Sequence, residues 1–374
     1  MDENRPCFFV CSATPYPSED KRRQNYSNMP NSNLNRAKEA KKDEFYTQLE
    51  DINNELCHYR QHFRGKTVLC NCDDPRISNF FTYFAYNFEF LGLRRLITTC
   101  YKNQDMDLFS QNDCEQAVYL VYDGDRNGNN IPDPTEIGIH PLQGDGDFRS
   151  QECIRLLEQA DIVVTNPPFS LFREYVSQLM KYHKQFLIIG NMNAITYKEI
   201  FPLIMQNKMW MGQSIHSGDR KFYVPDYYDL NAAGCGIDET GRKFIRVKGV
   251  RWFTNLDYKE RHEPIILTKH YTPEEYPHYD NYDAIEVSKS GDIPCDYDGV
   301  MGVPITFLDK YIPEQFEILG ITDQENARVA ENTANLNNKM AAISSLIISG
   351  HKKYDRPYIN GERKYARILI RRKK

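Results

Sequence analysis

The stretch Asn166-Pro-Pro-Phe169 combines residue types that could hold a planar amine. The Asn166 side chain offers a carbonyl oxygen, and Pro167 offers a backbone carbonyl with no competing N–H group. Pro167 and Pro168 stiffen the turn, so both acceptors would point in fixed directions. Phe169 supplies a flat face on which a base can stack. These residues predict a site that binds an amine-bearing ring; the alternative is a Pro-rich turn with a buried Phe.

The segments on either side of this turn match the elements of an open α/β sheet. Residues 162–164 form a short, β-branched, apolar run, which predicts a buried parallel strand. The turn would then lie at the carboxyl end of that strand, where such sheets place their ligands. An amphipathic helix is predicted after the turn by Leu171, Phe172, Tyr175, Val176 and Leu179. In this setting, Asn-Pro-Pro-Phe resembles the catalytic signature of methyltransferases that act on exocyclic amines.

Strands and helices alternate along the first half of the chain. The spacing of apolar residues predicts a helix over 48–62, and strands are expected at 67–72, 93–99, 116–122 and 186–190. This alternation predicts a doubly wound parallel sheet. Beyond about residue 205 the pattern becomes β-rich, which indicates strands that close the sheet and then a separate module.

The composition is that of a soluble globular protein: 374 residues, 40% hydrophobic and 26% charged. No apolar run of about eighteen residues is present, and the N-terminus lacks the order of a signal peptide. The ten cysteines show no repeated C-x-x-C pattern. Cys70 and Cys72 alternate on one face of a predicted strand, which suits buried free thiols better than a metal site. We therefore expect no metal, no membrane contact and a reducing, cytoplasmic location.

The net charge of −5 does not by itself indicate a nucleic-acid binder. Residues 351–374, however, are basic throughout and carry interleaved tyrosines. Such a tail can neutralise phosphates and add salt-dependent affinity. The alternative is a solvated terminal strand over 365–370 with a charged end, and both interpretations stay open at this point.

The segment from Asp123 to Asp133 resembles a calcium-binding loop. Oxygen-bearing side chains such as Asp123 and Asp125 occur at alternate positions, and Gly128 stands at the sixth. However, Pro134 occupies the twelfth position, where a bidentate Glu is required, and no helix is expected before the loop. A polar hairpin turn is therefore favoured over a calcium site.

Several longer segments together resemble the EcoRI-type adenine-specific DNA methyltransferases. The similarity begins near Ala37, reaches the C-terminus, and leaves out only the N-terminal arm and the insertion near Asp123. The segments that carry it are 42–47 (KDEFYT), 69–75 (LCNCDDP), 78–81, 144–150 (GDGDFRS), 161–175, 196–199, 279–285 and 299–307. Segments this long and this numerous are far more specific than the four-residue motif alone.

This resemblance implies a Rossmann-like class I fold that uses S-adenosyl-L-methionine to methylate the N6 amine of adenine in double-stranded DNA. The four residues of the turn would be catalytic, with the adenine flipped out of the duplex and stacked on Phe169. The implied parts are a flexible arm (1–33), a methyltransferase domain (34–260) and a target-recognition region (261–374). We also expect a monomer and a cognate restriction endonuclease. The alternatives are a cytosine-N4 methyltransferase and a catalytically silent DNA-binding protein.

The resemblance also assigns residues to the cofactor and to the target base. Those expected at the cofactor are Phe45, Tyr46, Thr47, Asp73, Asp74, Pro75, Asp147 and Phe148. The first three would lie near the methionine moiety, the next three in the first cofactor loop, and the last two beside the cofactor's adenine. The Gly-x-Gly of the wider superfamily is missing from that loop. Phe222 or Tyr223 would form a second stacking wall for the target base.

Overall fold

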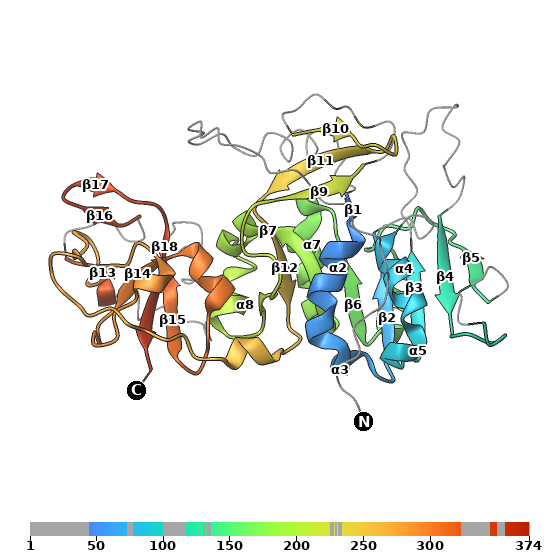
Figure 1. The fold of residues 1–374 in the computed structure, drawn as a ribbon, viewed down its shortest axis with the longest axis horizontal. Coiled ribbons are helices and arrows are strands. Elements are labelled where there is room, and N and C mark those ends of the chain that lie inside the picture. Colours follow the sequence, from blue (N-terminus) through green and yellow to red (C-terminus); the bar gives the residue numbers. More distant parts are fainter. Residues whose placement is uncertain are drawn as a thin grey trace.

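The computed structural model describes residues 45–72, 78–99, 117–129, 132, 136–224, 228, 230, 234–322, 345–349 and 356–373 (Figure 1). The expected arm over 1–33, the loop residues Asp73, Asp74 and Pro75, and Asp133 lie outside these ranges. None of the helices within the ranges has the length and apolar character needed to traverse a bilayer.

An eight-stranded sheet in the order β5-β4-β3-β2-β6-β7-β12-β8 forms the centre of the molecule (Figure 1). Its strands are β2 (Thr67–Cys70), β3 (Arg95–Thr99), β4 (Val118–Tyr122), β5 (Gly138–Pro141), β6 (Ile162–Thr165), β7 (Gln185–Asn191), β8 (Trp210–Met211) and β12 (Val250–Thr254). The four neighbouring strands β3, β2, β6 and β7 run parallel to one another. The outer strands pair antiparallel, and β12 and β8 close one edge as predicted. The predicted α/β fold is therefore confirmed.

Helices cover both faces of this sheet. One face carries α2 (Leu49–Leu56), η1 (Cys57–Tyr59), α3 (Arg60–Phe63), α4 (Asn79–Tyr86) and α5 (Phe88–Leu91), and the other carries α6 (Gln151–Gln159), α7 (Phe172–Lys181) and α8 (Phe201–Met205). Successive strand residues point to opposite faces. Accordingly Val68 packs in the cluster beneath α2 to α5, whereas Leu69 packs in the cluster beneath α6 and α7. Burial of the strands on both faces explains their unbroken apolar runs.

Strand β4 departs from the predicted parallel arrangement, because it pairs antiparallel with β3 and with the edge strand β5, for which no strand is predicted. Strands β4 and β5 form an antiparallel pair, which needs no crossover helix between them. In the connecting loop, Asp123 binds the Arg95 guanidinium at 2.6 Å, and this contact lowers the pKa of the Asp123 carboxyl. Asp125 Oδ1 accepts a hydrogen bond from the Gly128 N–H at 2.7 Å. The described carboxylates of the loop therefore bind the chain itself, as expected for a polar hairpin turn.

The C-terminal region forms a second sheet in the order β13-β14-β18-β15. Its strands are β13 (Ile285–Glu286), β14 (Met301–Pro304), β15 (Phe316–Ile321) and β18 (Arg367–Arg372), with the hairpin β16 (Tyr358–Ile359) and β17 (Glu362–Arg363) nearby. The basic tail contributes β18, which lies between β14 and β15 with its central residues buried. Arg367 binds Glu286 at 2.7 Å and Arg371 binds Glu317 at 3.1 Å. The described part of the tail thus comprises a short hairpin and an inner strand, and Arg367 and Arg371 of that strand have internal partners.

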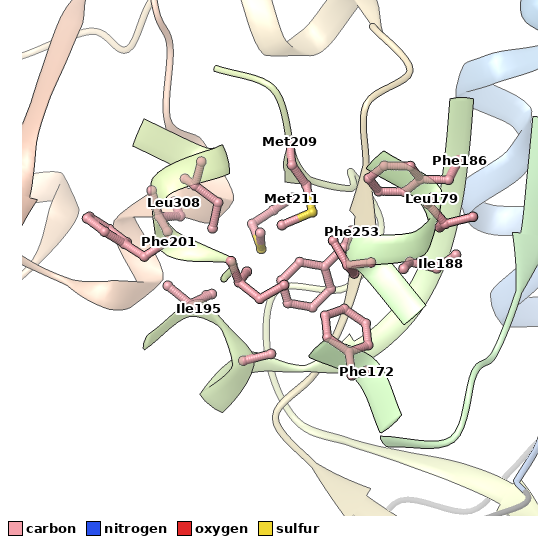
Figure 2. Close-up of a cluster of buried hydrophobic side chains, with 14 of the residues drawn as sticks. Phe172, Leu179, Phe186, Ile188, Ile195, Phe201, Met209, Met211, Phe253 and Leu308 are labelled. Carbon is pink, nitrogen blue, oxygen red and sulfur yellow. The ribbon is translucent and has the colours of Figure 1, made fainter. Parts of the chain in front are cut away.

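One apolar core runs from the main sheet into the C-terminal region. Phe253 of β12 and Met211 of β8 belong to the same buried cluster as Phe201 of α8 and Leu308 (Figure 2). Leu308 lies in the 3-10 helix η6 (Ile305–Lys310), which precedes β15. The hydrophobic core is therefore shared between the predicted methyltransferase domain (34–260) and the predicted target-recognition region (261–374).

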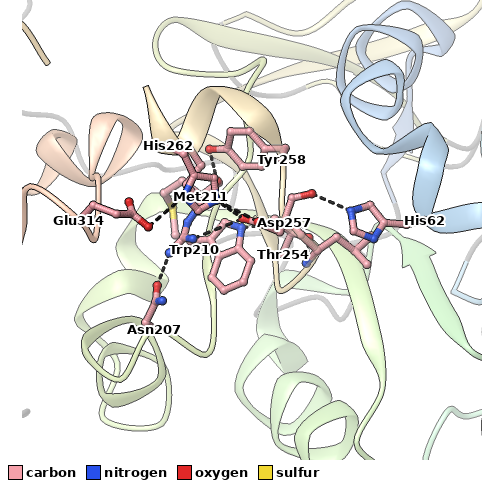
Figure 3. Close-up of polar contacts among 11 residues, drawn as sticks. His62, Asn207, Trp210, Met211, Thr254, Asp257, Tyr258, His262 and Glu314 are labelled. Carbon is pink, nitrogen blue, oxygen red and sulfur yellow. Dashed lines mark hydrogen bonds and ion pairs between the residues drawn. The ribbon is translucent and has the colours of Figure 1, made fainter. Parts of the chain in front are cut away.

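Polar contacts join the same elements around the segment that follows β12 (Figure 3). The Arg261 guanidinium stacks on the Trp210 ring, 3.9 Å from its centroid. His262 lies between Asp257 at 2.8 Å and Glu314 at 3.0 Å, and hydrogen bonds to these carboxylates raise the pKa of its imidazole. The 3-10 helix η4 (Lys259–His262) therefore connects the last sheet strands to the C-terminal region.

A buried ion pair reinforces this junction. Arg251 of β12 binds Asp309 of η6 through two nitrogens, at 2.8 and 3.0 Å. The two side chains are 3% and 5% exposed. Burial raises the pKa of the Asp309 carboxyl. Arg251 also donates to the backbone carbonyls of His216 and Val250, so its guanidinium is well supplied with acceptors.

Replacing Asp309 by Ala should lower the free energy of unfolding by about 3–5 kcal/mol, because Arg251 would keep a buried charge without its partner. Urea denaturation followed by circular dichroism measures the change. Glu317→Ala is the matched control, since it removes a more exposed ion pair with Arg371 and should cost at most about 1 kcal/mol. Equal losses in the two variants would contradict this account of the junction.

Candidate active site

The Asn166-Pro-Pro-Phe169 turn begins where β6 ends, at the carboxyl edge of the parallel strands. In the sheet, β6 lies on one side of β2 and β3 lies on the other. The chain therefore adds strands in opposite directions from β2, and the point between β2 and β6 is where the direction of strand addition reverses. Thr165 Oγ1 donates a hydrogen bond to the Asn71 carbonyl, and Tyr175 Oη donates one to Asn71 Oδ1. All three residues are buried, so these bonds tie together the ends of β2 and β6.

The Asn166 side chain is fixed in one orientation. It is 5% exposed, and its Nδ2 donates to the Phe45 carbonyl at 2.6 Å. Only the amide nitrogen can donate to a carbonyl, so Nδ2 faces the Phe45 carbonyl and Oδ1 points away from it. Oδ1 is buried and accepts no hydrogen bond from the described residues. An unmet buried acceptor costs about 1–3 kcal/mol, and a ligand N–H at this position would satisfy it.

Aromatic rings gather around Phe169, which opens the 3-10 helix η2 (Phe169–Leu171) and is partly buried. The Phe169 ring meets the Phe45 ring edge-on, with centroids 5.8 Å apart. The Phe45 ring lies 5.9 Å from the ring of Phe222, which is 1% exposed. The structure therefore brings these three rings together. Tyr223 follows Phe222 on a strand, so its side chain points to the opposite face and lies outside this group.

A small antiparallel sheet covers this edge of the main sheet (Figure 1). Its order is β1-β9-β11-β10, with strands β1 (Tyr46–Thr47), β9 (Asp219–Tyr223), β10 (Gly236–Ile237) and β11 (Lys243–Lys248). The Thr47 carbonyl accepts a hydrogen bond from Asn79 Nδ2 at 2.6 Å, at the start of α4. The predicted cofactor motif, Phe45 to Thr47, is thus held between the small sheet and α4, next to the Asn166–Phe169 turn.

The predicted cofactor residues Asp147 and Phe148 precede α6, and Phe148 packs on the opposite face of the main sheet from Phe45. Phe148 is buried, and its ring centroid is 5.0 Å from that of Tyr175, the residue that binds Asn71. Asp147 accepts hydrogen bonds from the Arg149 guanidinium at 2.7 and 3.0 Å, which hold the pKa of the Asp147 carboxyl below its usual value. Tyr175 therefore connects this segment to the ends of β2 and β6.

Cys72 adopts the backbone conformation that a glycine would supply in the loop after β2. Its φ of +77° lies in the left-handed region, which L-residues enter at a cost of about 1–2 kcal/mol. Cys72 therefore takes a left-handed backbone conformation at the end of β2, where the sequence has no glycine. The Cys72 side chain also lies beside the hydroxyl of Tyr175, whose pKa is raised mainly by burial.

Asn71, Thr165 and Tyr175 belong to the site without being among its predicted residues. Asn71 and Thr165 carried a signal, because each is a polar residue at the end of a buried strand. Tyr175 lies on the apolar stripe of α7 and was therefore expected in the core. Its hydroxyl was the available signal, since a buried Tyr O–H usually finds an acceptor.

Comparison with known proteins identifies the family to which the chain belongs. The family model described as "Adenine-specific methyltransferase EcoRI" matches residues 33–373. The chain belongs to this family. The resemblance identified in the sequence is thereby confirmed, and the chain is a site-specific DNA methyltransferase that acts on adenine.

Three relatives carry the name Type II methyltransferase. M.EcoRI from Escherichia coli is 52% identical over 294 residues, which cover 78% of this chain and 90% of the relative. M.MgeORF184P from Mycoplasma genitalium is 36% identical over 346 residues, covering 91% of this chain and 98% of the relative. M.MpnI from Mycoplasma pneumoniae is 36% identical over 348 residues, with the same coverage of 91% and 98%. No solved structure matches the chain.

Cys72→Gly should change the free energy of unfolding by no more than about 1 kcal/mol, because glycine accepts positive φ without strain. Cys72→Val should destabilise the protein by at least about 1–2 kcal/mol, since a β-branched residue is a severe outlier in this conformation. Urea denaturation measures both changes. The control is Cys57→Val, at an exposed cysteine whose φ is −59°. If the Cys72→Val variant were as stable as the Cys72→Gly variant, the left-handed turn would not be a requirement of the fold.

Proposed function

We propose that this enzyme transfers a methyl group from S-adenosylmethionine to the N6 amine of an adenine flipped out of a short duplex DNA site. The observation that carries the proposal is Asn166 Oδ1, a buried acceptor that receives no hydrogen bond from the described residues. An exocyclic amine supplies the donor that this oxygen lacks. The Pro167 carbonyl is the proposed acceptor for the second N–H of the same amine.

The proposed chemistry depends on these two acceptors. The N6 lone pair of adenine is delocalised into the ring, so the amine is a poor nucleophile. Hydrogen bonds from its two N–H groups to Asn166 and Pro167 favour a pyramidal nitrogen and stabilise the positive charge that develops as it attacks. The Phe45 carbonyl holds the Asn166 amide in place, so the acceptor needs no reorientation. The surplus proton leaves to water after the transfer.

We assign the cofactor to the residues around the carboxyl ends of β2 and β6. Thr47 Oγ1 is buried and has no hydrogen-bond partner in the described part of the chain, which fits a polar group of a bound ligand. Phe148 offers an apolar ring, and Asp147 offers a carboxylate whose lowered pKa keeps it ionised. Residues 73–75 keep their proposed place in the first cofactor loop. When bound, S-adenosylmethionine supplies an activated sulfonium methyl, so transfer requires alignment more than a general base.

The target adenine must leave the base stack to reach Asn166. Phe169 is the proposed stacking partner that replaces its neighbours in the duplex. Of the two candidates for a second wall, we retain Phe222, because it shares an aromatic group with Phe169 through Phe45. Tyr223 points away from this group.

The wider setting is also part of the proposal. We propose that residues 34–260 carry out methyl transfer and that residues 261–374 read the DNA site, with the chain acting as a monomer. A cognate restriction endonuclease would cut the same site when it is unmethylated. A cytoplasmic location is supported by the cysteines, since the six described ones are all free thiols.

Asn166→Ala should lower kcat by about 10²–10³-fold, the effect of removing one hydrogen bond to a developing charge, while cofactor binding remains. Transfer from labelled S-adenosylmethionine to unmethylated duplex DNA, followed by base-resolved mapping, measures activity and site together. Asn193→Ala is the control, because Asn193 is an exposed residue of the 3-10 helix η3 (Met192–Thr196) at the same sheet edge. Near-normal turnover of Asn166→Ala would refute the mechanism, and label on cytosine would favour the cytosine-N4 alternative.

Phe169→Ala should weaken capture of the flipped base by about tenfold to a hundredfold, since stacking of one base contributes about 1–3 kcal/mol. Phe169→Tyr preserves the ring and should bind normally. The fluorescence of 2-aminopurine at the target position reports the flipped state directly. If the Ala variant gave the same fluorescence change as the Tyr variant, Phe169 would not be the stacking partner.

A further inference from the structure

We infer that the outer face of the small sheet contacts the phosphate backbone of the DNA strand that carries the target adenine. The basic and aromatic residues of this face are Lys221 and Tyr223 on β9 and Phe244, Arg246 and Lys248 on β11; the carboxylate of Asp219 lies on the same face, opposite Lys248. The inference rests on the proposed function, because it takes the flipped adenine to lie at Asn166.

The pairing of β9 with β11 shows that these five side chains share one face. Phe244 lies opposite Tyr223, and Arg246 lies opposite Lys221. Directly opposed residues of an antiparallel pair point to the same side of the sheet. The side chains between them face the protein interior and are buried: Phe222, Ile245 and Val247. The inner face therefore belongs to the core around Phe45, whereas Arg246 and Lys248 on the outer face are exposed.

The outer face combines cations with aromatic rings. Strands β9 and β11 place three cations on this face, Lys221, Arg246 and Lys248, together with one acidic residue, Asp219, in a chain whose net charge is −5. Lys221 Nζ lies 4.8 Å from the ring centroid of Tyr223 and 4.5 Å from that of Phe244. Basic residues interleaved with aromatic rings are typical of surfaces that bind nucleic acid.

Arg246 and Lys248 are the two cations of this face best placed to bind phosphate. The Arg246 side chain is 50% exposed, and its ion pair with Asp219 is long at 3.4 Å. Such an exposed pair contributes little energy and can yield to a phosphate oxygen. Lys248 is also exposed. Arg367 of the basic tail is less accessible, because its 2.7 Å ion pair with Glu286 is largely buried.

The position of the small sheet fits a role beside the flipped nucleotide. A flipped base rotates about the backbone, so its own phosphates remain in the strand, close to the entrance of the base site. Tyr46 of β1 pairs with Tyr223 of β9, and the preceding residue, Phe45, holds Asn166. One sheet thus connects the catalytic amide to the cationic face. A strand whose adenine reaches Asn166 would pass this sheet.

The double variant Arg246→Gln/Lys248→Gln tests the inference. Fluorescence anisotropy with a duplex containing the methylation site gives Kd between 50 and 200 mM salt. The slope of log Kd against log salt should fall by about 2, because each lost phosphate contact removes about one released counterion. The charge-reversal variant Arg246→Glu/Lys248→Glu should weaken binding further. Calorimetric titration should give an unchanged Kd for S-adenosylmethionine in both variants.

The control Arg64→Gln/Lys181→Gln removes two exposed charges from the opposite edge of the main sheet and should leave the slope unchanged. An unchanged slope in the Arg246/Lys248 variants, or an equal fall in the control, would overturn the inference. Methylation by the unmodified enzyme is measured in parallel. If that enzyme failed to methylate DNA, the proposed function would fail, whereas normal methylation with an unaltered salt slope would refute only the surface.

Discussion

The hydrogen bond from Asn166 to the Phe45 carbonyl is the contact on which the active site depends. An amide in a buried turn can rotate and satisfy itself in several ways, and only the observed orientation leaves Oδ1 without a partner among the described residues. The Phe45 carbonyl selects that orientation across a separation of 121 residues. The resulting unmet acceptor costs about 1–3 kcal/mol, which the surrounding core must offset.

The support for Phe45 extends well beyond the active site. Phe45 precedes β1, which is held by β9 on one side and by Asn79 on the other. The connection leading to β9 is fixed in turn by Glu55, a fully buried carboxylate on α2. Glu55 accepts hydrogen bonds from the backbone N–H groups of Gln213 and Ser214 at 2.9 and 2.7 Å. A single small sheet is therefore anchored at both ends, which limits the movement of the Asn166 amide.

The C-terminal region is joined to the methyltransferase sheet by both apolar and ionic contacts. The buried cluster that includes Phe253 and Leu308 connects the two parts by direct hydrophobic packing. The Arg251–Asp309 pair fixes their relative position, since a buried pair requires close geometry on both sides. If the C-terminal region reads the DNA site as proposed, these contacts would hold that site in a defined register to the Asn166–Phe169 turn.

The sequence was sufficient for the features that depend on local pattern. The apolar run before Asn166 and the helical spacing after Phe169 placed the catalytic turn between a strand and a helix, as observed. The helix expected over 48–62 is also present, although η1 interrupts it. These features follow from periods of two and 3.6 residues, which are visible in a short window of sequence.

Other features could be decided only by contacts between distant parts of the chain. The antiparallel pairing of β4, the internal position of β18 and the role of Tyr175 at Asn71 leave no local pattern in the sequence that distinguishes them from their alternatives. The same holds for Cys72, whose left-handed backbone is set by the turn after β2 and not by its residue type. The sequence by itself thus determined the family resemblance and the residues proposed to carry the chemistry. The tertiary structure decided how Asn166 is oriented, because its hydrogen-bond partner is brought to it only by folding.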